Sequence, residues 1–529
     1  MKNAVIAGLV SLSLFPAHAK DWPQWGGDQH RNMYSEEKGL PDRFEPGKLK
    51  KGTEEVDLAT TKNVKWVAKL GSQSYGNATI ADGRVFVGTN NDAPRNNRDE
   101  GDRSIMMVFG EKDGSLLWQL VVPKLASGKV NDWENLGLLS SPTVEGKFVY
   151  VVTSRCEVMC LDVSGLSDGN QGMQDEGQYI AGPGKPKVQL NDKDADIIWV
   201  YDMITDLGVF PHNASNCSVL IVGDIVYACT SNGQDWSHSN IPSPLSPSFI
   251  ALDKKTGELL GEDDAAIGPK IFHGQWSSPS MGVVNGKPQV YFGGGDGVLY
   301  AFDPKPSKGQ IDGEDVNLLK RVWWFDANPP EYKVKDGKPI RYPAAEGPSE
   351  INATPTFWKN RVYVAIGQDP EHGEGIGNLV CVDPTGTGDV TKTKQIWSFK
   401  RINRSISTVS ITPEGLLFVG DFSGFVYCLN ADTGEHYWTH DMKAHMWGST
   451  MVADGKVYVG DEDGDLVVLE ASKTKKIVSE TNLGAPVYST PVIANGVLYI
   501  ASNTHLYALY DEARAKAVSD QPQKIELKK

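Results

Sequence analysis

The chain repeats itself with a period of about forty residues towards its C-terminal end. Three segments between Ser407 and Leu509 each run from a Ser-Thr pair through a glycine turn into an alternating apolar strand. The equivalent residues Leu429, Leu469 and Leu509 are separated by 40 positions. A period near forty with several short strands in each unit is typical of a radial β-propeller.

The same pattern extends over most of the chain and gives eight units. Their innermost strands begin at small or hydroxylated residues near Asn77, Ser141, Ser218, Ser278, Ala353, Thr408, Ser449 and Thr490. The eighth unit has no outer strand of its own, whereas a strand-like segment, residues 63–70, stands unused before the first unit. We therefore predict an all-β fold: an eight-bladed propeller over residues 58–510, whose ring closes when residues 63–70 complete the last blade.

A tryptophan recurs in the outer strand of several units. The expected positions are Trp118, Trp199, Trp324, Trp397 and Trp438. Glycine turns and period-two alternation around these positions are typical of hairpin-connected strands.

Both ends of the chain differ from the repeats. Residues 1–19 combine Lys2, an apolar core and the small-x-small sequence Ala17-His18-Ala19, which predicts a signal peptide cut after Ala19. The protein is therefore expected to be periplasmic or secreted. Residues 20–57 are expected to pack on the outside of the propeller, and residues 511–529 form a charged tail.

Charge and hydropathy exclude several classes of partner. The formal net charge of −15 argues against nucleic acid. After the N-terminus, no stretch of eighteen apolar residues could span a bilayer. The candidate partners that remain are a small-molecule substrate, a periplasmic protein or a glycan.

Six cysteines in an oxidising compartment can form disulfides. Cys217 and Cys229 flank a predicted hairpin turn, so they form a plausible pair. The Cys-x-x-Cys-His motif does not occur, which excludes covalently attached haem.

Residues 429–438, with the sequence LNADTGEHYW, resemble the tryptophan-docking repeat of quinoprotein dehydrogenases, which use pyrroloquinoline quinone (PQQ). Residues 78–88 are similar to the start of these propellers, and residues 109–118 are a weaker copy of the docking repeat. The resemblance covers most of residues 58–510. It implies a quinoprotein-type oxidoreductase with PQQ and Ca²⁺, acting on a small alcohol or a sugar-like substrate.

The same repeat also builds non-catalytic periplasmic propellers, including outer-membrane assembly factors, so the resemblance implies a binding or scaffold role as the alternative. The chain departs from the quinoprotein alcohol dehydrogenases in two respects. It has no adjacent cysteine pair, and their calcium ligands and catalytic base cannot be placed by motif.

Loops on one face of a propeller surround the central channel, and here they are rich in reactive side chains. His273, His212 and Glu350 are the candidate catalytic residues, because imidazole and carboxylate groups serve as general bases. The candidate cofactor-binding residues are Arg404 and Lys443 for an acidic ligand, Trp276 and Trp447 for stacking on a flat ring, and Asn352 as an oxygen ligand for Ca²⁺.

A His-ligated metal enzyme is a third possibility. His445, His238 and His372, with Glu134, are candidate ligands for Zn²⁺ or Cu²⁺, because imidazole nitrogen suits both ions. Each of these ligands would come from a different loop.

Overall fold

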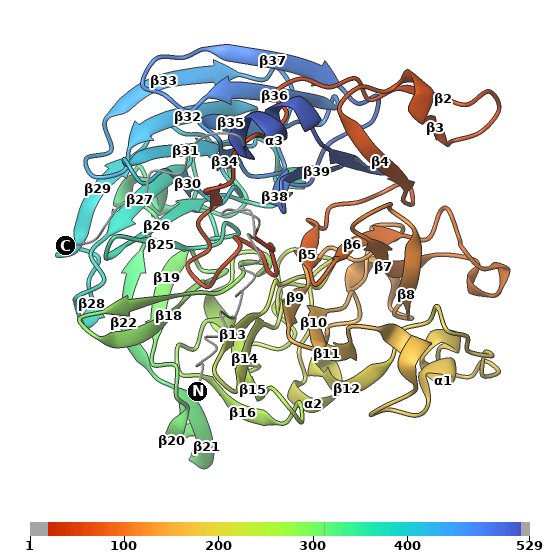
Figure 1. Cartoon of the computed structure of the whole chain (residues 1–529). Coiled ribbons are helices and arrows are strands. Elements are labelled where there is room, and N and C mark those ends of the chain that lie inside the picture. The colour runs from red at the N-terminus through yellow and green to blue at the C-terminus, as the bar shows by residue number, and fades with distance from the viewer. Residues whose placement is uncertain (1–19, 312, 520–529) are drawn as a thin grey trace, which may run out of the picture.

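A computed structural model describes residues 20–311 and 313–519. Within these residues, eight small antiparallel sheets stand around a central axis (Figure 1). The predicted signal peptide, residues 1–19, and the last ten residues of the predicted tail lie outside the described residues.

Blades 1 to 4 follow one another in chain order, each with four strands from the axis outwards. Blade 1 contains β5 (Thr79–Ala81), β6 (Arg84–Asn90), β7 (Arg103–Gly110) and β8 (Leu116–Pro123). Blade 2 contains β9 (Thr143–Glu145), β10 (Phe148–Val152), β11 (Glu157–Asp162) and β12 (Ile197–Asp202). Blade 3 contains β13 (Leu220–Val222), β14 (Ile225–Cys229), β15 (Phe249–Asp253) and β16 (Leu259–Asp263). Blade 4 contains β17 (Ser280–Val284), β18 (Lys287–Gly293), β19 (Val298–Phe302) and β22 (Arg321–Asp326).

Blades 5 to 8 have the same organisation. Blade 5 contains β25 (Thr356–Trp358), β26 (Arg361–Ile366), β27 (Asn378–Val382) and β29 (Gln395–Phe399). Blade 6 contains β30 (Ser410–Ile411), β31 (Leu416–Gly420), β32 (Phe425–Asn430) and β33 (His436–Asp441). Blade 7 contains β34 (Met451–Ala453), β35 (Lys456–Gly460), β36 (Asp465–Glu470) and β37 (Ile477–Asn482). Blade 8 contains β38 (Val492–Ala494), β39 (Val497–Ala501), β40 (His505–Leu509) and β4 (Val64–Lys69).

Short strands and helices decorate the ring. The added strands are β1 (Tyr34–Ser35), β2 (Lys48–Leu49), β3 (Val56–Asp57), β20 (Ser307–Ile311), β21 (Glu314–Leu319), β23 (Val334–Lys335), β24 (Lys338–Pro339) and β28 (Gly388–Asp389). The α-helices are α1 (Glu176–Ala181), α2 (Met203–Leu207) and α3 (Glu512–Ser519). None of the helices in the described ranges is both long and apolar enough to cross a membrane.

The ring closes as the repeat count predicts. Strand β4 pairs antiparallel with β40, the third strand of blade 8, with Trp66 opposite Ala508. In Figure 1 the red start of the chain therefore lies beside its blue end. This confirms the predicted eight-bladed propeller closed by an N-terminal strand.

Neighbouring blades are joined by a tryptophan of one outer strand and a turn of the next blade. The indole N–H donates to a backbone carbonyl of that turn in five pairs: Trp66 to Glu111, Trp118 to Val163, Trp199 to Lys254, Trp397 to Ala431 and Trp438 to Ser472, at 2.8 to 3.2 Å. In four of them the ring lies against a glycine of positive φ, namely Gly114, Gly165, Gly257 or Gly434, where an added Cβ would come within 2.5 to 2.8 Å of the indole. A glycine is therefore required for this close packing.

Blade 4 uses a different tryptophan from the predicted Trp324. Trp323 is fully buried and donates to the side-chain oxygen of Gln289 at 3.0 Å, and Gln289 in turn donates to the carbonyl of Pro384 in blade 5. Trp324 is half-buried beneath the guanidinium of Arg321. The prediction was wrong because two tryptophans are adjacent here and successive strand residues point to opposite sides of a sheet. Trp323 lies opposite Ala301, in the register that Trp118 has opposite Val108, so it is Trp323 that faces the next blade.

A belt of hydrogen bonds encircles the axis just before the innermost strands. The backbone N–H of one belt residue donates to the side chain of its equivalent in the next blade. These links join Asn77 to Ser141, Ser141 to Ser218, Ser218 to Ser278, Thr354 to Thr408, Thr408 to Ser449, Ser449 to Thr490 and Thr490 to Asn77. The repeated hydroxyls in the sequence therefore serve as blade-to-blade contacts, and the fifth unit uses Thr354 in place of the predicted Ala353.

Residues 22–37, part of the segment expected to pack on the outside of the propeller, cross the axial opening at one end of the ring (Figure 1). The segment contacts the innermost region of every blade in order. The contacts are Trp22 with Ile80, Pro23 with Val144, Gln29 with Ile221 and Met281, His30 with Phe357, Asn32 with Ile411, Met33 with Val452, and Glu37 with Asn495. The segment therefore connects all eight blades at this end of the ring.

Arg31 and Trp25 close the axis. Arg31 is fully buried, and its guanidinium donates to the carbonyls of Pro279, Val219 and Trp25. The indole of Trp25 donates to the hydroxyl of Thr354 in the belt at 3.0 Å. The central channel is consequently blind at this end.

The six cysteines are all buried free thiols. Cys217 Sγ accepts a hydrogen bond from the backbone N–H of Cys229 at 3.3 Å, but no disulfide joins them. The two residues are not directly opposite, because the ladder between β13 and β14 starts only at Leu220.

The docking contact at the seam gives a stability prediction. We expect Trp66→Ala to destabilise the protein by about 3 to 5 kcal/mol, because it removes a buried indole between blades 8 and 1. Trp324→Ala is the matched control, with an expected effect of about 1 kcal/mol, because that ring is half-buried outside the docking position. Urea unfolding followed by circular dichroism measures both. An equal loss of unfolding free energy in the two variants would show that the docking contact of Trp66 does not stabilise the ring more than an ordinary half-buried side chain.

Candidate functional site

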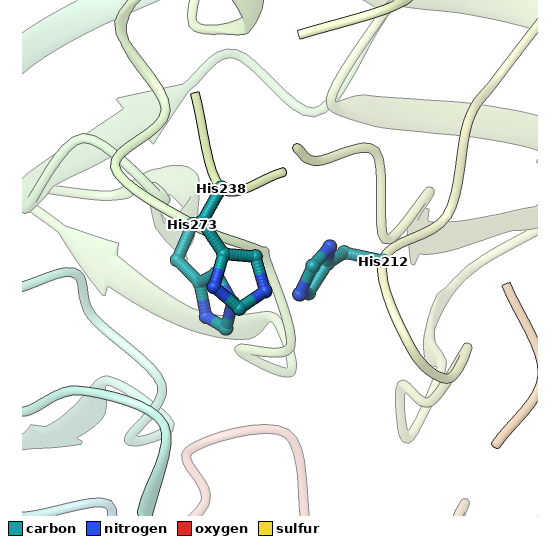
Figure 2. Close-up of side chains that lie close together, drawn as sticks. All are labelled: His212, His238 and His273. Atoms are coloured by element: carbon teal, nitrogen blue, oxygen red, sulfur yellow. The ribbon is translucent and has the colours of Figure 1, made fainter. Parts of the chain in front are cut away.

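Four histidines meet at the open end of the ring, on loops of three adjacent blades. His212 precedes blade 3, His238 lies between β14 and β15, His273 precedes blade 4, and His372 lies between β26 and β27 of blade 5. The ring of His273 is centred 4.0 Å from His212, 4.8 Å from His238 and 4.3 Å from His372. Figure 2 shows the rings of His212, His238 and His273 gathered around one space.

The backbone at Gln234 holds two of these histidines. Its N–H donates to the carbonyl of His273 at 2.8 Å, and its carbonyl lies 2.6 Å from Nδ1 of His212. The carbonyl can only accept, so Nδ1 of His212 carries the proton and Nε2 has a free lone pair. The preceding Gly233 permits this approach, since a Cβ there would come within 2.7 Å of both His212 and His273.

Five ring nitrogens of the cluster are buried without a hydrogen-bond partner. They are Nε2 of His212, Nε2 of His238, both nitrogens of His273, and Nδ1 of His372. An unsatisfied buried polar atom costs about 1 to 3 kcal/mol. A cluster that served packing alone would not gather five of them.

The cluster also favours uncharged imidazoles. Burial lowers the pKa of His212 to about 4 and that of His372 to about 4. Burial and the neighbouring imidazoles hold the pKa of His273 well below its usual range. Neutral rings with free lone pairs are the form that binds a metal ion.

Three of the histidines have the geometry of a metal site. One nitrogen each from His212, His238 and His273 lies within 4.8 Å of the others, a spacing that could hold an ion. Three protein ligands with an open position are typical of catalytic zinc sites, whereas structural zinc sites use four. Because all the donors are imidazoles, the set fits Zn²⁺ or Cu²⁺.

A buried acidic group adjoins the histidines. Glu350 Oε1 accepts from the backbone N–H of Asp369 at 3.2 Å and lies 3.4 Å from the Tyr342 hydroxyl and the Asn352 amide, whereas its Oε2 has no partner. Burial, with a further contribution from Asp369, raises the pKa of Glu350 to about 8. Burial also raises the pKa of Asp369 to about 6. Tyr342 connects the two groups, since its ring centre lies 5.6 Å from that of His372.

A cavity of about 290 Å³ opens at the axis beside these groups. Its aromatic lining residues are Tyr75, Trp133, Trp276, Trp447 and Tyr488. Its polar lining residues are Asn213, Asn216, Asn352, Asp369 and Glu371. No lysine or arginine lines it in the part of the chain that the structure describes.

Comparison with known proteins agrees with the repeat. Residues 422–518 match the model of a PQQ-repeat family described as outer membrane protein assembly factor BamB. The match covers the C-terminal part of the ring, from blade 6 onwards, and the whole ring has the eight-bladed β-propeller fold. No curated protein matches the chain.

Solved structures resemble this propeller in fold. A europium-containing methanol dehydrogenase is 12% identical, with 91% of this chain and 89% of that chain covered and a TM-score of 0.57. BamB from Moraxella catarrhalis is 16% identical, with 84% of this chain and 96% of that chain covered and a TM-score of 0.49. At these identities, the methanol dehydrogenase supports the fold and no more.

The cavity does not fit the PQQ that the resemblance implies. PQQ carries carboxylates, which need cationic partners in a buried site. Arg404 donates to the carbonyls of Ala344 and Glu374 and is not among the lining residues. Lys443 is exposed on the surface, while Asp369 and Glu371 would repel an anion.

The structure brings the other predicted cofactor residues to the cavity. Trp276 donates its indole N–H to the carbonyl of Ala214, and Trp447 donates to Glu462, both at about 3 Å. Asn352 lies between them and Glu350, with its side-chain oxygen unpartnered.

Two predicted metal ligands lie apart from the histidine cluster. His445 stacks on Phe422 and lies 3.5 Å from both Glu374 and Glu462, on the side of blade 7. Glu134 is exposed and makes no described contact with the histidines. Neither residue belongs to the set of three that could hold one ion.

Sequence reasoning missed Tyr342, Tyr75 and the carbonyl of Gln234. Tyr342 lies in the long insertion between blades 4 and 5, whose path no repeat predicts. Its only signal is an aromatic residue within a proline-rich loop. A backbone carbonyl has no signature in the sequence.

The raised pKa of Glu350 predicts how stability depends on pH. The pKa rises from 4.5 to about 8 on folding, so the folded state binds the extra proton between these values, and stability must fall as pH rises through this window. Glu350→Gln fixes the neutral form. We expect the variant to unfold at least about 2 °C higher than the wild type at pH 8, with no gain at pH 5.

Thermal unfolding at pH 5, 6.5 and 8 measures this difference. Glu371→Gln, an exposed carboxylate in the same cavity, is the matched control and should follow the wild type. A Glu350→Gln curve parallel to that of the wild type at all three pH values would contradict a protonated Glu350.

Proposed function

We propose that this propeller is a metal-dependent enzyme, in which His212, His238 and His273 hold Zn²⁺ or Cu²⁺ beside the axial cavity. The observation that carries the proposal is the set of buried imidazole nitrogens without partners. Their convergence within one space and their low proton affinity both support it.

A divalent ion at this position would polarise a substrate oxygen or lower the pKa of a bound water. The surrounding residues prepare that chemistry. The carbonyl of Gln234 accepts from Nδ1 of His212, which fixes the ring orientation and directs Nε2 towards its neighbours. His372 lies next to His273, with ring centres 4.3 Å apart, and adds a further imidazole beside the three that would hold the ion.

Glu350 and Asp369 are suited to proton transfer. Both carboxyls have a pKa raised towards neutral pH, so each can give up or accept a proton near neutral pH. Asp369 lines the cavity, whereas Glu350 lies behind it against Tyr342. We assign Asp369 as the general acid–base residue, and Glu350 as a buried proton-holding group beside it, whose pKa Asp369 helps to raise.

A quinoprotein-type oxidation of an alcohol or sugar-like substrate has less support, because the cavity offers no cation for PQQ. A binding or scaffold role is the second candidate. The match of residues 422–518 to a family of outer-membrane assembly factors favours it. That role does not account for the unpartnered imidazoles. The apolar N-terminal stretch before Lys20 supports export in either case.

Metal analysis tests the proposal directly. We expect the purified full chain to bind one equivalent of Zn²⁺ or Cu²⁺, and His273→Ala to weaken that binding by about 100-fold or more, beyond the 10- to 100-fold typical of outer-sphere changes. His445→Ala is the matched control and should bind like the wild type, because His445 lies outside the cluster. Elemental analysis and competition with a chelator measure both.

Two outcomes would contradict the proposal. One is the absence of stoichiometric binding of either ion. The other is equal affinity in the wild type and His273→Ala, which would place the ion elsewhere.

A further inference from the structure

The axial cavity continues below its aromatic opening into a smaller chamber of about 140 Å³. The two spaces share several lining residues, including Tyr75, Asn216, Asn352 and Trp447, so they form one axial well. The lower chamber is lined by the hydrogen-bonded belt and by Trp25. Trp25 and Arg31 close the bottom of the well.

The upper part of the well is an aromatic collar. Tyr75 stacks on Tyr488 with ring centres 4.8 Å apart, and Trp447 lies 5.5 Å from Tyr75. Trp133 and Trp276 also line the upper cavity. All five rings are half-buried. Flat ring faces of this kind pack against the C–H faces of a saccharide ring.

The lower part is a floor of hydroxyl groups. Belt residues such as Ser141, Thr408 and Thr490 accept a backbone N–H of the preceding blade through their side-chain oxygen. Among the described residues, none of these three hydroxyls donates to a protein acceptor, so their protons remain available to a ligand. A ring of hydroxyls and amides with no charge among them suits a neutral polyol.

The charges of the well exclude other ligands. Asp369 and Glu371 line the upper cavity without a lysine or arginine among the described lining residues, which disfavours anions. Three of the five rings, Tyr75, Trp447 and Tyr488, pack on one another, and part of their faces is thus used within the collar and not for a quaternary ammonium ion. An uncharged, polyhydroxylated ring matches both collar and floor.

We propose that the well binds the terminal residue of a neutral saccharide. This inference rests on the proposed function, whose substrate class it names: the sugar ring lies in the collar, and its hydroxyls meet the floor and Asn352. Because the well is blind, a polymer cannot thread through the ring. The enzyme therefore acts on chain ends, beside the histidine cluster on blades 3 to 5.

Saccharide binding is tested on the full chain after removal of metal with a chelator, so the result does not depend on the metal site. The probes are glucose, galactose, mannose, xylose and their linear disaccharides, with choline and acetate as a cation and an anion. Isothermal titration calorimetry and tryptophan fluorescence measure binding. We expect one site per chain for at least one saccharide, and none for choline or acetate.

Two variants locate the site. Trp447→Ala should weaken binding by about tenfold, because it removes a ring of the collar. Thr408→Val keeps the side-chain shape but removes a floor hydroxyl, and should weaken binding by about threefold or more. Trp358→Phe is the matched control without effect, because Trp358 lines neither cavity.

Chain-end recognition is tested with linear and cyclic oligosaccharides of one sugar, such as maltohexaose and α-cyclodextrin for glucose. Only the linear form should bind, since the cyclic form has no terminal residue. Four results would each overturn the inference. The protein binds no saccharide, it binds choline alone, Trp447→Ala binds the saccharide as tightly as the wild type, or the cyclic form binds as tightly as the linear one. Metal binding without saccharide binding would refute this inference alone, and saccharide binding without metal binding would refute the proposed enzyme alone.

Discussion

The structure depends on the contact between an outer-strand tryptophan and the glycine turn of the next blade. A single four-stranded blade cannot bury both of its faces, so each needs a neighbour on either side. The indole fixes the distance between blades, because its ring fits only where the turn lacks a Cβ, as at Gly114 and Gly257. At the seam, Trp66 makes this contact from the other end of the chain, which turns a row of sheets into a closed ring.

Much of this architecture could be predicted from the sequence, because it repeats. The period predicted the number and order of the blades. Because the eighth unit lacks an outer strand, residues 63–70 could be predicted to complete it. Single features without a repeat were harder to predict. Trp324 was predicted in place of Trp323 because the two tryptophans are adjacent, and only the strand register shows which of them faces the next blade. The path of residues 22–37 follows from contacts with all eight blades, and no local pattern predicts such contacts.

The candidate site was partly predictable for the same reason. Counting blades placed His212, His238, His273 and His372 on loops of one face, and these four lie together. The blade order also places blades 3 to 5 next to one another and His445, before blade 7, on another side, so the repeat itself argues against grouping His445 with the other histidines. The repeat could not distinguish the exposed Lys443 and Glu134 from buried residues, since burial of a loop residue depends on how other loops fold over it.

The blades are alike, but the loops make the open end of the ring asymmetric. Blades 3 to 5 contribute the imidazoles and Glu350, whereas the loops before blades 1, 7 and 8 contribute Tyr75, Trp447 and Tyr488. A ligand on the axis therefore meets the aromatic collar and Asp369, whereas the imidazoles and Glu350 lie behind the cavity lining on the side of blades 3 to 5. The closed bottom fixes its depth, because Trp25 occupies the axis below the belt. Different parts of the chain thus set the depth of the ligand along the axis and its orientation across the axis. The loops can therefore change the chemistry of the site without disturbing the docking contacts that hold the ring together.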